Sequence, residues 1–297
     1  MSFIQSPFGL TVLMILGLTM FGAPIGLSMI GASIFYLFFV GQDIGIAAEQ
    51  LLQGIYNSYT LLSVPLFIIA ANFMSLGAMS DKLMEFCNAL VGRFRGGMGH
   101  VNVISSLIFA GMSGSAVADA VGIGKLTIEM MVKDGRYTPS YAAAITAATA
   151  VIGPIIPPSI PMVLFALVSD ASIGYLFLAG VIPGILMALV MSLVNWRMAI
   201  KHDFPVEAPV PIRELPRITW ESLPALMMPV VLLGGIYGGV MTPTEAAAVA
   251  ASYALVVSWL LYRSVTLRAT YTSLVSSARN TASVGILIAG ALVFNYV

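Results

Sequence analysis

The sequence has little charge, cysteine or histidine. Charged residues make up 9% of its 297 positions, whereas about a quarter of the residues in a soluble globular domain are charged. The single cysteine, Cys87, excludes an internal disulfide framework, and two histidines leave no His/Cys metal constellation. The formal net charge is zero, which gives no indication of nucleic acid as a partner. These shortages argue against a soluble, disulfide-stabilised or His/Cys metal-binding protein.

Apolar residues are abundant instead, at 59% of the chain, and the mean hydropathy is +0.98. Uncharged segments such as 25–40, 61–76 and 181–194 approach the roughly 20 residues that a helix needs to cross a bilayer. The N-terminus lacks the basic region that begins a cleaved signal peptide, so we interpret it as the first span. The sequence therefore predicts an all-α polytopic membrane protein.

The positive charges predict the topology. All thirteen Lys and Arg residues can lie in the cytoplasm, as the positive-inside rule favours, if the chain first turns inward at Lys82. Lys125 and Arg136 then lie inside only if the apolar segment 100–122 enters and leaves on the same side. We therefore predict a re-entrant helical hairpin there rather than a full span.

The remaining segments follow from this sidedness. In chain order we expect spans at 5–21, 25–40 and 58–78 (a scaffold, 5–78), the hairpin at 100–122, a broken helix at 138–170, spans at 172–196, 223–239 and 245–262, and an outward-going apolar run at 281–297. Residues 197–222 are expected to form a cytoplasmic linker. Thr138 and Thr242 mark helix starts, each followed by proline. Glu245 completes a capping box with Thr242, so we interpret it as a cap rather than a proton carrier.

Two parts of the chain are related by an internal repeat. Aligning Pro24 with Pro243, an offset of 219 residues, brings the region FGAPIGLSMIGASIFYLFF into register with MTPTEAAAVAASYALVVSW. At nearly the same offset, LLSVPLFIIAANFM falls on TASVGILIAGALVF. The first unit, residues 1–196, begins outside and the second, residues 223–297, begins inside, which is the inverted-topology repeat of many secondary transporters. The second unit is incomplete, so we expect the chain to be truncated at its C-terminus.

The predicted helix from Thr138 is interrupted by a cluster of prolines. The stretch AATAVIGPIIPPSIPMVLF has four prolines within eight residues, from Pro154 to Pro161. Each internal proline removes a backbone donor and clashes with the preceding turn, so the cluster predicts an unwound segment. Carbonyls without partners are costly in hydrocarbon, and such backbone persists only where it is buried in protein or lines a polar cavity.

The stretch GMSGSAVADA, residues 111–120, is the matching break at the tip of the predicted hairpin. Ser113 and Ser115 supply hydroxyl oxygens, and Gly114 permits unusual backbone angles. Free carbonyls and hydroxyls suit Na⁺, whereas half-helix N-termini favour a carboxylate. The two breaks together therefore predict a site for a cation and an organic anion. The alternative is that the Gly/Ser motif only allows close helix packing.

Other polar residues near the tip have more than one interpretation. Asp119 is either a helix cap or a functional intramembrane acid. Asn102, Ser105 and Ser106 are expected to bond to backbone along the first arm of the hairpin. The segment Gly122–Lys125 superficially suggests a phosphate loop, but its glycine spacing and the leucine after the lysine do not fit that motif.

Longer stretches of the sequence carry a family resemblance. They are GMSGSAVADAVGIG, KDGRYTPSYAAAITAATAVIGPIIPPSIPMVLFAL, GVIPG and GGVMTPTEAAAVAASYAL. Together they resemble the large membrane subunit of TRAP transporters, the DctM type, over essentially the whole chain. The resemblance implies an elevator-type, inverted-repeat fold in the bacterial inner membrane that imports organic acids, such as C4-dicarboxylates or sialic acid, on a Na⁺ gradient. It also implies a small membrane subunit and a periplasmic substrate-binding protein as partners, no enzymatic activity, and no cofactor besides Na⁺ as the coupling ion.

Residue by residue, the resemblance places a Na⁺ site on both breaks. The Na⁺-binding candidates are Ser113, Gly114, Ser115, Gly153, Ile156 and Pro157, and the substrate-side candidates are Asp119, Pro158 and Ser159. An ion or organic-anion channel is the alternative function, although a channel does not need broken helices in an inverted repeat. An intramembrane protease would need a Ser/His or paired-Asp arrangement within the spans, which the sequence does not provide.

Overall fold

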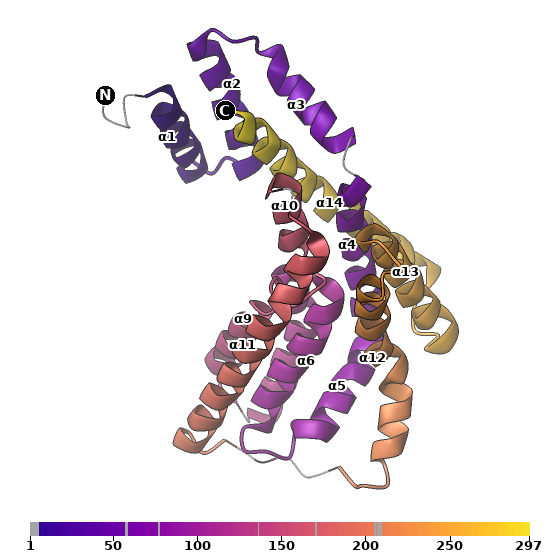
Figure 1. Cartoon of the computed structure of the whole chain (residues 1–297). Coiled ribbons are helices and arrows are strands. Elements are labelled where there is room, and N and C mark those ends of the chain that lie inside the picture. The colour runs from indigo at the N-terminus through magenta and orange to yellow at the C-terminus, as the bar shows by residue number, and fades with distance from the viewer. Residues whose placement is uncertain are drawn as a thin grey trace.

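The computed structural model describes residues 6–56, 59–76, 78–135, 137–169, 171–204, 206 and 210–297. Within these ranges the regular structure is entirely helical (Figure 1). The predicted all-α class is confirmed, and its cause is the apolar composition, because a backbone surrounded by lipid must satisfy its polar groups inside helices. Arg136 and Asp170, two charges that entered the predicted topology, lie outside the described residues.

The N-terminal helices are short. α1 (Pro7–Met20) begins at Ser6, whose hydroxyl accepts a hydrogen bond from the first turn at 3.0 Å. α2 (Ile25–Val40) ends at Gly41, which has a left-handed φ of 78°. These bounds agree with the first two predicted spans. α3 (Gly45–Tyr56) follows in a region to which the sequence analysis assigned no helix.

Two further helices lead to the cytoplasmic side of the predicted topology. α4 (Ser63–Ser75) ends before residue 78, the predicted end of this span. α5 (Ala78–Val91) then forms a helix around Lys82, where the sequence analysis assigned no helix. α5 buries Met79, Leu83 and Cys87, whose helical spacing places them on one face. That spacing predicts an amphipathic helix, which a search for long uncharged segments does not detect.

Four later helices are long and apolar enough to cross a membrane: α11 (Ile173–Lys201), α12 (Leu215–Tyr237), α13 (Pro243–Val256) and α14 (Leu267–Tyr296). α13 reaches this length because a π turn continues it to Leu261. α11 and α12 extend into the predicted linker 197–222, which is therefore partly helical. α14 begins well before the predicted apolar run 281–297. Hydropathy marks the part of a helix that lies in lipid, whereas backbone hydrogen bonding continues through the polar turns on either side.

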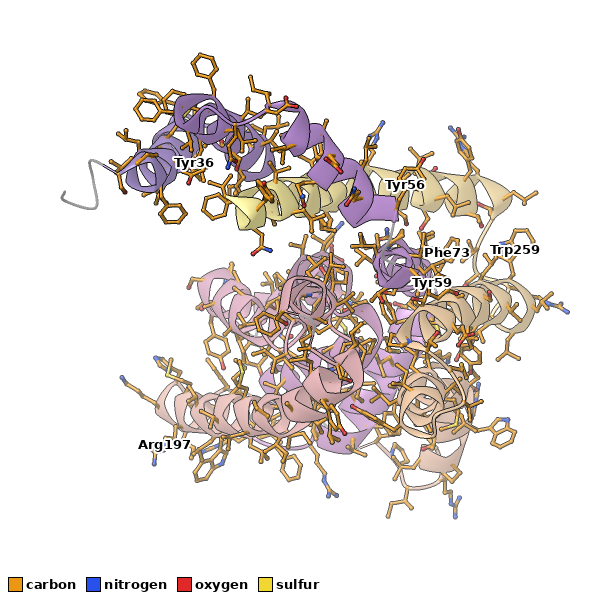
Figure 2. The ribbon with its side chains drawn as sticks, turned by 45° about the horizontal axis from the view of Figure 1, so that its top comes forward. Tyr36, Tyr56, Tyr59, Phe73, Arg197 and Trp259 are labelled. Atoms are coloured by element: carbon orange, nitrogen blue, oxygen red, sulfur yellow. The ribbon has the colours of Figure 1, made fainter. Side chains whose placement is uncertain are left out.

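The outer surfaces of several helices are apolar. Large hydrophobic side chains of α1, α2 and α11 are exposed, as expected where a helix faces lipid tails. Figure 2 shows such side chains along the outside of α11, with Arg197 projecting outward near its C-terminal end.

The predicted helix caps are also present: Thr242 and Glu245 form a reciprocal capping box at the start of α13, and Thr138 caps the helix that begins at Pro139.

Two pairs of helices cross closely and join the two halves of the chain. α2 packs against α14, and α13 packs against α4. A Cβ atom added at Gly26 of α2 would lie 2.6 Å from the Ile286 carbonyl oxygen, and one added at Gly290 would lie 2.5 Å from the Gly26 carbonyl oxygen. Small residues permit such close approach of helix backbones. In the predicted repeat, α2 corresponds to α13 and α4 to the later part of α14, so the two pairs are equivalent across it.

The hairpin and the broken helix lie together beside α11 (Figure 1). α6 (Gly97–Ser113) leads to a reversal, and α7 (Ala116–Asp119), a π turn and α8 (Lys125–Val132) return along it. α9 (Pro139–Ala150) and α10 (Ile160–Ser169) lie on either side of the proline segment. The helices of the hairpin thus extend beyond the predicted 100–122 at both ends, because its polar ends are helical as well.

Candidate functional site

The chain reverses direction at Gly114, between α6 and α7. Gly114 has a φ of 60°, a left-handed conformation that glycine adopts without steric cost. Ser115 then caps α7, because its hydroxyl accepts a hydrogen bond from the Ala118 backbone N–H at 3.4 Å. The Gly-Ser pair therefore ends one helix and starts the next, which produces a hairpin rather than a continuous helix.

The proline segment forms the second break. Residues 151–159 form turns between α9 and α10, and the peptide between Pro157 and Pro158 is cis. The Ser159 hydroxyl donates to the Pro154 carbonyl oxygen at 2.5 Å and accepts a hydrogen bond from the first turn of α10 at 3.3 Å. Ser159 was predicted on the substrate side, but its hydroxyl is engaged within the break and caps α10.

The two breaks are in backbone contact. The Ile160 N–H donates to the Gly114 carbonyl oxygen at 3.2 Å, which joins the start of α10 to the hairpin tip. A Cβ atom added at Gly114 would overlap the Pro158 carbonyl oxygen, and one added at Gly153 would lie 3.1 Å from the Ser115 carbonyl oxygen. The structure therefore brings together four of the predicted site residues, Gly114, Ser115, Gly153 and Pro158, and position 114 requires glycine.

Among the predicted Na⁺ ligands, Ser113 has a side-chain oxygen that is left without an interaction. It is fully buried, and its hydroxyl has no hydrogen-bond partner. A buried polar group left in this way costs about 1–3 kcal/mol, which a bound cation at this position would offset. Ile156 instead turns its side chain into an apolar cluster with α6 and α11, which leaves only its carbonyl as a ligand. The Pro157 carbonyl oxygen faces α6 and would lie 3.9 Å from a Cβ atom added at Gly111.

Asp119 lies at the end of α7 and is 1% exposed. Neither carboxylate oxygen has a hydrogen-bond partner, so the side chain caps no helix. Ser106 faces it from α6 without hydrogen-bond geometry. No Lys or Arg in the described part of the chain forms an ion pair with Asp119. A buried group that only accepts hydrogen bonds attracts a cation or a proton.

A buried polar layer joins α6 to α9. The Asn102 side-chain amide donates to Thr146 Oγ1 at 2.7 Å, and its Oδ1 accepts from Thr149 at 3.2 Å. Ser105 donates to the Asn102 carbonyl oxygen at 3.1 Å, the backbone bonding predicted for this arm. Asn102 was predicted to do the same, but it links two helices instead. This layer holds α9, which leads into the proline segment, in register with the arm that leads to the tip.

The side-chain and backbone groups at the two breaks that could bind a cation are hydroxyls, carbonyls and a single carboxylate. Across the described ranges, no group of three or more His, Cys, Asp or Glu side chains is arranged to hold a metal ion. Hard oxygen ligands suit alkali and alkaline-earth cations, whereas transition metals favour imidazole and thiolate. Oxygen donors of this kind beside two helix starts are suited to a hard cation.

Comparison with known proteins places the chain among membrane permeases. The family model described as "Tripartite ATP-independent periplasmic transporter, DctM component" matches residues 12–297. The chain is 39% identical over 283 residues to the sialic acid TRAP transporter large permease protein SiaM of Vibrio cholerae, covering 95% of this chain and 66% of that protein. It is 36% identical over 289 residues to the 2,3-diketo-L-gulonate TRAP transporter large permease protein YiaN of Escherichia coli, covering 96% and 68%. It is also 36% identical over 255 residues to the C4-dicarboxylate TRAP transporter large permease protein DctM of Vibrio cholerae, covering 86% and 56%.

Proposed function

This chain belongs to the DctM family of tripartite ATP-independent periplasmic (TRAP) transporters, and on that premise we propose that it is the permease of a Na⁺-coupled importer of organic acids. Members of this family are transporter permeases, not enzymes. We place the protein in the bacterial inner membrane. The description of the family as tripartite and periplasmic supports a small membrane subunit and a periplasmic substrate-binding protein as partners.

The relatives support an organic acid as the transported solute. Their names give sialic acid, 2,3-diketo-L-gulonate and C4-dicarboxylates, all of which carry a carboxylate at neutral pH. The start of α10 at Ile160 lies at the junction of the two breaks, and a helix N-terminus carries a positive partial charge that favours such a group. A channel is not favoured, because the named relatives are permeases.

The observation that carries Na⁺ coupling is the buried, unpartnered hydroxyl of Ser113 where the two breaks meet. Asp119 adds a negative charge on the returning arm of the hairpin, with no basic partner among the described residues. A buried carboxylate repels a carboxylate solute and attracts a cation, so we place Asp119 on the cation side of the site rather than the substrate side. Binding of Na⁺ would satisfy both groups and prepare the junction for the anion.

The Na⁺ dependence of uptake tests this function. In the complete transporter reconstituted with its partners, Ser113→Ala should raise the Na⁺ concentration for half-maximal uptake about 5- to 150-fold, because about 1–3 kcal/mol of interaction is lost. Asp119→Asn should raise it as well, since it removes the negative charge at nearly constant size. The measurement is initial uptake of a labelled organic acid at a series of Na⁺ concentrations.

Ser33 provides a matched control for Ser113. Its hydroxyl is also fully buried without a hydrogen-bond partner, but it lies on α2. Ser33→Ala should therefore leave the Na⁺ dependence unchanged. Uptake that continued undiminished after Na⁺ was replaced by choline would disprove the coupling. Equal shifts in the Ser33 and Ser113 variants would disprove the assignment of the ion to the two breaks.

A further inference from the structure

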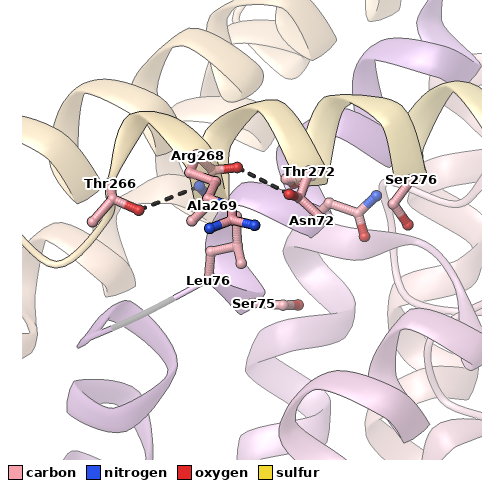
Figure 3. Close-up of a pocket in the computed structure, with 9 residues that line it drawn as sticks. Asn72, Ser75, Leu76, Thr266, Arg268, Ala269, Thr272 and Ser276 are labelled. Carbon is pink, nitrogen blue, oxygen red and sulfur yellow. Dashed lines mark hydrogen bonds between the residues drawn. The ribbon is translucent and has the colours of Figure 1, made fainter.

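A cavity of about 540 Å³ lies between the C-terminal end of α4 and the first turns of α14 (Figure 3). Its polar lining includes Asn72 and Ser75 from α4, and Arg268, Thr272 and Ser273 from α14. None of these residues belongs to the two breaks. The cavity is therefore a second place where the protein presents polar groups to a ligand, at the contact between the two units of the predicted repeat.

Arg268 gives this cavity its charge. Among the described residues that line the cavity, it is the one charged residue, and none carries a carboxylate. Figure 3 shows the Arg268 guanidinium group reaching toward Leu76, the residue that follows α4. In the part of the chain that the structure describes, no Asp or Glu forms an ion pair with Arg268. A cationic fork without an acidic partner selects an anion with several acceptor oxygens.

The Ser273 hydroxyl is a second polar group of the cavity lining that is available to a ligand. Ser273 is 6% exposed, and its Oγ has no hydrogen-bond partner. Its neighbours are already engaged: Ser75 donates to the Ala71 carbonyl oxygen at 2.9 Å, and Thr272 donates to the Arg268 carbonyl oxygen at 2.9 Å. Ser273 thus adds a buried hydroxyl donor to the residues that line the cavity.

The surroundings of the cavity are those of a membrane surface. Leu267 and Tyr271 beside it are 73% and 70% exposed, and Trp259, which projects from the edge of the molecule in Figure 2, donates to Thr270 at 3.1 Å. Exposed aromatic side chains with a polar tip are typical of the membrane–water interface. The predicted topology places Arg268 on the cytoplasmic side, so the cavity opens at the level of the inner-leaflet headgroups.

We propose that this cavity binds the phosphate of an anionic phospholipid headgroup. Arg268 supplies the charge, Ser273 supplies a hydrogen bond, and the acyl chains lie along the exposed apolar side chains at the start of α14. Basic pockets between helices on the cytoplasmic side are suited to such headgroups. The bound lipid would bridge α4 and α14 beside the hydrogen bond from Asn72 to Ser277, which measures 2.7 Å. This site is independent of the identity of the transported solute.

Native mass spectrometry of the purified, delipidated protein tests the proposal, with phosphatidylglycerol and phosphatidylcholine added separately. We expect saturable binding of phosphatidylglycerol at concentrations at which phosphatidylcholine does not bind. Arg268→Gln should weaken this binding about tenfold, because a charge-assisted contact is lost. Arg268→Lys, which keeps the charge, should weaken it less, and Ser273→Ala should weaken it severalfold.

Arg279→Gln is the matched control, because Arg279 is an exposed arginine on the same helix that does not line the cavity. It should leave the binding unchanged. Equal weakening in the Arg268 and Arg279 variants, or equal binding of both lipids, would overturn the proposal. Inorganic phosphate distinguishes the source of the anion: phosphate that displaced the lipid at comparable concentration would identify a site for small anions and overturn the lipid assignment.

Discussion

Two of the regions that contain internal prolines have opposite structures. α12 contains Pro224 and Pro229 and is still one helix from Leu215 to Tyr237. Residues 151–159, which contain three prolines, form turns between α9 and α10 instead. Both regions belong to an apolar membrane protein, so hydropathy does not distinguish them. The spacing of the prolines does, because each one removes a single backbone donor.

The two regions also satisfy their carbonyl groups differently. In α12, the Tyr253 hydroxyl donates to the Pro224 carbonyl oxygen at 2.8 Å, and the Tyr262 hydroxyl donates to the Glu221 carbonyl oxygen at 2.7 Å. Side chains that follow α12 in the chain, in α13 and just after its π turn, thus contact the backbone of α12. At the proline segment, the Ser159 hydroxyl donates to the Pro154 carbonyl oxygen, and the Ile160 N–H donates to the Gly114 carbonyl oxygen of the hairpin tip. The two prolines of α12 leave the helix intact, whereas the cluster leaves polar backbone for a second break or a ligand.

The largest effect is expected where the two breaks meet. Gly114→Ala places a Cβ atom against the Pro158 carbonyl oxygen and in a left-handed conformation. The combined strain of about 2–5 kcal/mol should lower organic-acid uptake at least roughly 30-fold. The measurement is the initial uptake rate at equal amounts of protein in the membrane. Gly31→Ala in α2, where an added Cβ meets nothing within 4 Å, should leave uptake normal. Normal uptake by the Gly114 variant would show that the breaks need not touch.

An intermediate effect separates the two proline regions directly. Pro157→Ala restores a backbone donor and allows part of the segment to rewind, so its carbonyls turn inward and Na⁺ binding should weaken about tenfold. Pro224→Ala restores a donor in a region that is already helical, so Na⁺ dependence should change less than about twofold. Both variants are compared by titrating Na⁺ against uptake. If Pro224→Ala shifted the curve as far as Pro157→Ala, the prolines would act on helix packing in general and not on an ion site.

The smallest effect concerns the support of the intact proline helix. Tyr253→Phe removes the hydroxyl that donates to the Pro224 carbonyl oxygen, so the free energy of unfolding should fall by about 1 kcal/mol while Na⁺ dependence stays normal. Thermal unfolding in detergent measures this loss. Tyr237→Phe, which alters an exposed tyrosine at the end of the same helix, should have no effect. A Tyr253 variant as stable as the unaltered protein would mean that this hydrogen bond to the backbone of α12 contributes nothing to stability.

Sequence reasoning succeeded where a residue acts through its own backbone and failed where it acts through its neighbours. The caps at Thr138 and Thr242 and the turn at Gly114 were predictable, because each depends on a local donor or a local angle. α5 and the first half of α14 were missed, because they are helices with polar faces that hydropathy does not mark. The bond from Ser159 to the Pro154 carbonyl oxygen was not predictable, since it exists only after the chain has turned.

The sequence by itself determined a helical membrane protein and the positions of its two breaks, because composition sets the solvent and glycine and proline set the allowed backbone. Only the tertiary structure decided that the breaks touch, that α2 crosses α14 while α4 crosses α13, and that Ser113 and Asp119 are buried without partners. These features depend on distances between segments that are far apart along the chain. Such distances are set by how the apolar faces pack together, and no local pattern of residues records them.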